Sequence, residues 1–148
     1  AAAQASYQRR RTSGKAADDA VQHWLRVVYR PVSRHLSQIL SSLNDEVDQL
    51  AADPFDDDLM DAFQAYLNDC RSSLTHAQRS FRSYPNPPVL AQAASHLYYT
   101  LSQVGDALDE LERFSMCYDE HYLHTGQEMF RIARHLKRET QTALNNHF

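Results

Sequence analysis

The sequence predicts an all-α protein, an elongated up-down four-helix bundle with coiled-coil-like packing. The first observation is an apolar ladder in steps of three and four residues, made by Leu90, Ala94, Leu97, Leu101, Val104, Leu108 and Leu111. This period of 3.5 residues keeps one face of a helix against another helix. The second observation is that the 148 residues include only three glycines and five prolines. Sheet proteins need many tight turns, so a few long helices are favoured.

The first helix is predicted over residues 16–51. Its apolar face repeats at the same spacing from Val21 to Leu50. Pro31 interrupts the pattern, and we expect a kink there because a proline removes one backbone hydrogen bond and its ring clashes with the preceding turn. Residues 1–15 have no helical period and are predicted to be a basic, flexible tail or linker, which leaves 16–148 as a single domain.

The second helix is predicted over residues 54–83. Asp53 is a candidate N-cap, and Pro54 suits the first helical position. The segment YPNPP at residues 84–88 then ends the helix. Asn86 is predicted to cap the next helix.

The third and fourth helices are predicted over residues 87–118 and 120–147. The 3.5-residue beat continues after Leu111, less apolar in its middle, through Ser115, Tyr118, Tyr122, Thr125, Met129, Ile132 and Leu136. We place a turn in the softer stretch, within 115–126, because it gives four helices of nearly equal length. Thr125-Gly126-Gln127-Glu128 has the pattern of a capping box. The alternative is one helix of about 60 residues, about 90 Å long, which would need a partner chain.

Charge is distributed unevenly along the chain. Residues 1–34 carry a net charge of +5 and residues 35–148 carry −9, with eight carboxylates between Asp45 and Asp61. The acidic body would repel phosphate, which argues against a nucleic-acid partner. The basic end at Arg9–Arg11 could lie next to a membrane. A strip of Arg131, Arg134 and Arg138 is predicted to pair with acidic residues on the first two helices.

Compartment and source are predicted from composition. Cys70 and Cys117 form no CxxC motif, and a reducing, cytoplasmic compartment is expected. No apolar stretch reaches the 18 residues that span a membrane. Arginines outnumber lysines 13 to 2, which suggests a GC-rich, bacterial genome.

Three side chains form a candidate metal site on the last helix. His121, His124 and Glu128 are offset by three and four residues, which places them on one helical face. Imidazole and carboxylate together suit Zn or Fe. The His124-x-x-x-Glu128 pair resembles the spacing within one helix of hemerythrin-like di-iron bundles. That resemblance implies further ligands from the other helices, where the histidines are His23, His35, His76 and His96.

A second resemblance concerns carboxylates four residues apart. Asp57-x-x-x-Asp61 and Asp106-x-x-x-Glu110 resemble the acidic pairs through which PhoU-like bundles bind metal. The paired Glu-x-x-His motifs of ferritin-like bundles are absent. These likenesses assign no family.

The sequence favours a non-catalytic interaction or regulatory domain that binds a protein partner or forms a homo-oligomer. It has no GxSxG motif and no glycine-rich phosphate loop, so no enzyme is predicted. The candidate partner-binding residues are Trp24, Tyr99, Tyr118 and Tyr122. Two alternatives remain open, a metal-binding four-helix bundle and the soluble cytoplasmic domain of a membrane protein.

Overall fold

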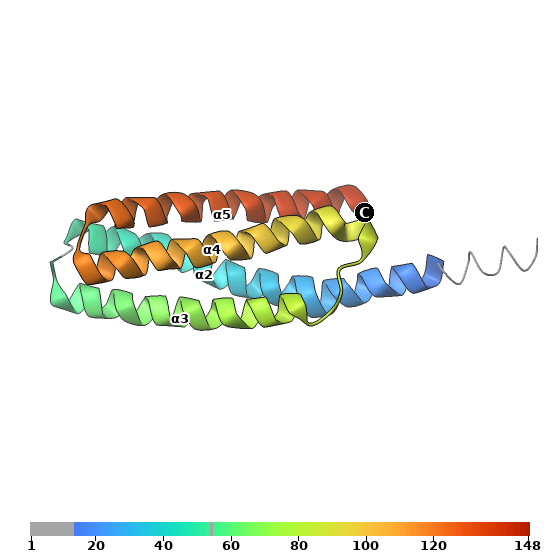
Figure 1. Cartoon of the computed structure of the whole chain (residues 1–148), viewed down its shortest axis with the longest axis horizontal. Helices are drawn as coiled ribbons and strands as arrows, with labels where there is room; N and C mark the ends of the chain where they lie inside the picture. Colours follow the sequence, from blue (N-terminus) through green and yellow to red (C-terminus); the bar gives the residue numbers. More distant parts are fainter. Residues whose placement is uncertain (1–13, 54) are drawn as a thin grey trace, which may run out of the picture.

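Long antiparallel helices build the protein (Figure 1). The structure is a computed structural model that describes residues 14–53 and 55–148. Helical residues 14–24 run into a π-turn, η1 (Leu25–Tyr29), and then into α2 (Arg30–Ala52). The other elements are α3 (Asp57–Arg82), a 3-10 turn η2 (Pro88–Leu90), α4 (Ala91–Cys117) and α5 (Glu120–His147). The all-α bundle predicted from the sequence is confirmed. The Arg9–Arg11 end lies outside the described residues.

The predicted kink at Pro31 takes the form of the π-turn that precedes it. The backbone N–H of Arg30 donates to the carbonyl of Leu25, a bond across five residues rather than four. Pro31 has no N–H, and in a regular helix its ring would press on the carbonyl of Val27. One wider turn accommodates the proline without ending the helix.

The connection between α2 and α3 corrects a predicted cap. Asp53 ends α2, where its N–H donates to Leu50 O at 3.2 Å. The N-cap of α3 is instead Asp56, whose side chain accepts from the N–H of Leu59 at 3.0 Å. Both aspartates suit a cap chemically, and the start at Asp57 places further carboxylates in the first turn of α3, where the helix dipole favours them.

Asn86 is also not a helix cap. Its side-chain oxygen accepts a hydrogen bond from Trp24 Nε1 at 3.0 Å. The chain passes through η2 before α4 begins at Ala91, and no side chain caps that start. The side chain of Asn86 therefore makes a tertiary contact with the first helix instead of the N-cap that the local sequence predicts for the third helix.

The turn between α4 and α5 lies at Tyr118 and Asp119, inside the predicted window, and it excludes a single continuous helix. The side chain of Asp119 caps α5 by accepting from the N–H of His121 at 2.9 Å. The predicted capping box at Thr125 is wrong. Thr125 lies within α5 and its hydroxyl donates to the carbonyl of His121 at 2.8 Å.

The apolar ladder holds along α4 but changes phase on α5. Its members from Leu90 to Leu111 are all buried, whereas Tyr122, Met129 and Leu136 are only partly buried and Ile132 is exposed. The turn re-phases the helix, so the buried face lies one residue further on, at Leu123, Gly126, Phe130, Ala133, Thr140 and Leu144.

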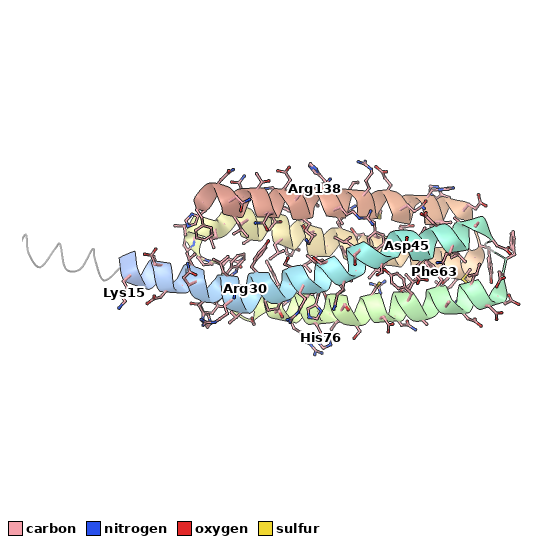
Figure 2. All side chains as sticks on the ribbon, turned by 180° about the vertical axis from the view of Figure 1, so that it is seen from behind. Lys15, Arg30, Asp45, Phe63, His76 and Arg138 are labelled. Atoms are coloured by element: carbon pink, nitrogen blue, oxygen red, sulfur yellow. The ribbon has the colours of Figure 1, made fainter. Side chains whose placement is uncertain are left out.

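The four helices are not evenly spaced. The α4 and α5 pair makes the closest contact, and the neighbouring pair α2 and α5 makes the weakest. Figure 2 shows α2 running obliquely, from Arg30 towards Asp45. Arg131 pairs with Glu128 of its own helix rather than with the predicted acidic neighbours on the first two helices, and Arg134 donates to Leu40 O. No helix in the described residues has the length and apolarity to cross a membrane.

Candidate partner-binding surface

Two connections meet at one end of the bundle and expose aromatic side chains there. The α2–α3 and α4–α5 connections lie together at the left of Figure 1. The rings of Phe55 and Tyr118 stack with centroids 6.0 Å apart and planes 19° apart. Phe55 is 77% exposed, Met116 is 75% exposed and Tyr118 is 40% exposed. We call Phe55, Met116 and Tyr118 the apolar tip.

Tyr118 occupies a backbone conformation that tyrosine rarely adopts. Its φ is 59°, and among the described residues no other non-glycine residue has a positive φ. Its N–H donates to Phe114 O at 2.8 Å and closes the end of α4. Glycine is the usual residue at such a left-handed cap, and a side chain there costs roughly 1–2 kcal/mol. The ring also packs edge-on against buried Phe114, at 6.3 Å between centroids. Tyr118 thus links the core to exposed Phe55.

Carboxylates surround the apolar tip. They come from the two connections and from the first turns of α3 and α5, and all are exposed: Asp53, Asp57, Asp58, Asp119 and Glu120. We call these five the acidic collar. Within the described chain none of them forms an ion pair. An apolar surface with a negative rim complements a segment that combines apolar and basic side chains.

A hollow of about 280 Å³ lies beside the tip between α3 and α4. Its lining includes buried Leu67 and the exposed Met116. Glu112 also lines it, and its carboxylate accepts a hydrogen bond from Arg71 Nε at 2.8 Å. The hollow can accommodate a side chain of a partner bound at the apolar tip. Side chains that fill such pockets contribute most of the binding free energy at protein interfaces.

The predicted partner residues are not brought together. Tyr118 belongs to the apolar tip, and Tyr122 lies one turn further on, partly buried and edge-on to His121 at 5.6 Å. Tyr99 is 56% exposed and packs against Tyr98 on α4, at 5.5 Å between centroids. Trp24 has no exposed surface, so it offers nothing to a partner of the folded domain.

The predicted metal ligands His121, His124 and Glu128 lie on the exposed face of α5, where Glu128 and His124 contact other side chains. Arg131 donates to Glu128, and this hydrogen bond holds the pKa of Glu128 below its usual value. His124 Nδ1 lies 3.3 Å from Gln127 Oε1. In residues 14–53 and 55–148 no group of three or more His, Cys, Asp or Glu is arranged to hold a metal ion. The Zn or Fe site at His121, His124 and Glu128 stays a prediction.

Three histidines of the other helices pack on aromatic rings away from His121. His35 and His76 stack with centroids 5.7 Å apart, and His23 packs on Tyr84 at 4.4 Å. Glu110, from one of the carboxylate pairs, binds Arg113 at 3.0 Å. The structure therefore does not gather these groups around His121.

One comparison with known proteins found a match. Residues 16–148 match the family described as "Cyanobacterial DnaJ chaperone, C-terminal domain". This span includes α2 to α5 and both connections of the apolar tip. Neither the curated proteins nor the solved structures contain a match to the chain.

Proposed function

This chain belongs to the family of cyanobacterial DnaJ chaperone C-terminal domains, and we propose that it serves as a non-catalytic domain that binds a protein partner. The apolar tip is the contact surface in this proposal. Its partner is a polypeptide segment that carries both apolar and basic side chains. A cytoplasmic location belongs to the same proposal.

The pairing of Phe55 with Tyr118 is the observation that carries it. Two aromatic rings from separate connections stack on each other, although Phe55 remains 77% exposed and Tyr118 40% exposed. Tyrosine at a glycine-type cap weakens the fold unless the ring contributes elsewhere. Exposed aromatic clusters with a polar rim are typical of protein-binding sites.

The acidic collar determines the sign of the partner charge. Negative side chains attract a basic segment over a distance set by ionic strength, about 10 Å at 0.1 M salt. The apolar tip would then bind the apolar side chains of the segment by burying their surface together with its own. A chaperone domain meets such segments in unfolded chains, which expose apolar side chains that folded proteins bury.

Peptide binding tests this proposal. The probe is a fluorescein-labelled peptide of alternating leucine and lysine, and the matched probe has glutamate in place of lysine. We expect the basic peptide to bind and the acidic one not to bind at the tip. The variant F55S/Y118G should weaken binding at least tenfold, and D57N/D58N should weaken it mainly at low salt.

Tyr99→Ser is the matched control, since it removes a tyrosine from α4, outside the tip, that is more exposed than Tyr118. Circular dichroism checks that each variant folds. Equal binding by wild type and F55S/Y118G would refute the proposal, and equal loss in Y99S would remove its localisation to the tip. If sedimentation instead finds a dimer that F55S dissociates, the tip serves self-association.

A further inference from the structure

The weakly contacting pair of helices, α2 and α5, encloses a groove of about 420 Å³. α5 contributes three cationic side chains to its lining, Arg134, Lys137 and Arg138. α2 and the end of η1 contribute Ser37, Ser41, Leu40 and Tyr29. We call this feature the basic groove. Figure 2 labels Arg30 on α2 and Arg138 on α5, the two helices that border it.

Two polar contacts between lining residues join the helices across the basic groove. The hydroxyl of Tyr29, at the end of the π-turn, donates to Gln141 Oε1. Arg134 Nη2 donates to the carbonyl of Leu40 at 3.0 Å. α2 lines the groove with the small side chains of Ser37 and Ser41, which leave the space open. The twelve residues from Tyr29 to Leu40 span eleven helical steps, which correspond to about 16 Å of helix.

The charge of the groove opposes that of the rest of the molecule. Its lining includes three cations and no carboxylate, although residues 35–148 carry a net charge of −9. In the described part of the chain neither Lys137 nor Arg138 forms an ion pair. These two ammonium and guanidinium groups can therefore serve an incoming anion without breaking an existing ion pair.

We propose that the basic groove binds a short acidic polypeptide segment in an extended conformation. A groove of about 16 Å accommodates roughly five extended residues at about 3.3 Å each, whereas a single inorganic anion would fill little of it. Leu40 and the aliphatic stems of Lys137 and Arg138 give the segment an apolar floor. The hydroxyls of Ser37 and Ser41 can donate to its carbonyl or carboxylate oxygens.

This site is independent of the apolar tip and prefers the opposite charge. The tip would take a basic segment at the end of the bundle, whereas the basic groove takes an acidic one between α2 and α5. Loss of one activity therefore leaves the other measurable in the same protein.

Fluorescence anisotropy with the whole chain tests the inference. The probe is a labelled five-residue peptide of glutamate and leucine, and the control probe replaces each glutamate by lysine. We expect K137Q/R138Q to weaken binding of the acidic peptide at least tenfold. The variant S37L/S41L, which fills the groove and keeps every charge, should weaken it by a similar factor. The matched control R79Q/R82Q removes the same charge from exposed positions at the end of α3 and should leave binding within twofold.

Competition experiments separate this inference from simpler electrostatic binding. Inorganic phosphate at millimolar concentration and vesicles of phosphatidylglycerol should not displace the acidic peptide. Displacement by phosphate would reduce the site to a simple anion site, and displacement by vesicles would assign it to membranes, so either overturns the peptide inference. It also fails if the acidic peptide does not bind, or if R79Q/R82Q loses as much affinity as K137Q/R138Q. The tip variant F55S/Y118G should bind the acidic peptide normally.

Discussion

Gly126 of α5 lies so close to Leu111 of α4 that a Cβ atom at position 126 would stand 2.7 Å from Leu111 Cδ2. The same atom would lie 3.4 Å from the carbonyl oxygen of Ala107. The two helices therefore approach each other where one of them has no side chain. This contact explains why α4 and α5 are the most tightly packed pair in the bundle.

Gly126→Ala should lower the free energy of unfolding by about 1–3 kcal/mol, since overpacking of a fitted core outweighs helix propensity. The propensity alone would raise stability by about 1 kcal/mol. Gly105→Ala is the matched control, because its Cβ would meet Leu74 at an ordinary 3.6 Å. Urea unfolding should show G105A more stable by about 0.5–1 kcal/mol. Equal stabilisation by both substitutions would contradict the close approach.

Tyr118 gives a second paired comparison. The variants Y118G and Y118A both lose the ring, but only glycine tolerates the left-handed cap without strain. We expect Y118G to be more stable than Y118A by about 1–2 kcal/mol. Thermal or urea unfolding measures this difference. Equal stability of the two variants would show that position 118 does not keep its positive φ in solution.

His35 should make stability depend on pH. Burial, together with the charges of Arg34 and His76, lowers the pKa of His35 below its ordinary value of 6.5. The unfolded chain therefore binds this proton more readily, and the contribution of neutral His35 is lost as pH falls below about 6.5. Urea unfolding at pH 7.5 and 5.5 should show a smaller difference in His35→Gln than in wild type.

His76→Gln is the informative companion variant for this pH effect. It removes one charge that disfavours protonated His35, so the difference between the two pH values should shrink without disappearing. A wild-type difference that H35Q leaves unchanged would assign the effect to other groups.

The two cysteines should differ sharply in reactivity. Burial raises the pKa of the Cys70 thiol to about 11, and Cys117 is exposed beside the apolar tip. Because the thiolate is the reactive form, a chromogenic disulfide at pH 8 should modify one thiol per folded chain and the second only after unfolding. Cys117→Ser should leave the folded protein almost unreactive. Rapid modification of both thiols in native protein would contradict the burial of Cys70.

The helices were predictable from the sequence because their signals are local. The apolar spacing and the Pro-rich segment place the helix ends within a few residues of where they lie. Which face of α5 is buried was not predictable from the sequence. A pattern counted through a turn keeps its spacing, but the turn changes which residues of the next helix face the core. Caps failed for a similar reason, because Asp53 and Asp56 suit the role equally and the folded chain decides between them.

The candidate site was only partly predictable. Tyr118 was among the candidate partner-binding residues, and it lies in the apolar tip. Phe55 and Met116 were missed, although Phe55 stands alone between a proline and three aspartates. Phe55 and Met116 form an exposed apolar cluster only because the α2–α3 and α4–α5 connections lie next to each other in the fold. The spacing of residues in the sequence does not predict that the two connections are neighbours. Trp24 faces the core, which the sequence leaves open because an aromatic residue beside the apolar stripe can face either the core or solvent.

The π-turn at Leu25–Tyr29 also fixes the rotational phase of the helix before it. One residue more than a regular turn needs rotates everything upstream by about 100°. Trp24 is buried in the core with this phase, and its Nε1 donates to exposed Asn86 at the edge of the core. A deletion of one residue within the π-turn would therefore turn Trp24, the largest buried side chain, towards solvent and detach the start of the bundle, although the core side chains of α2 to α5 would all remain.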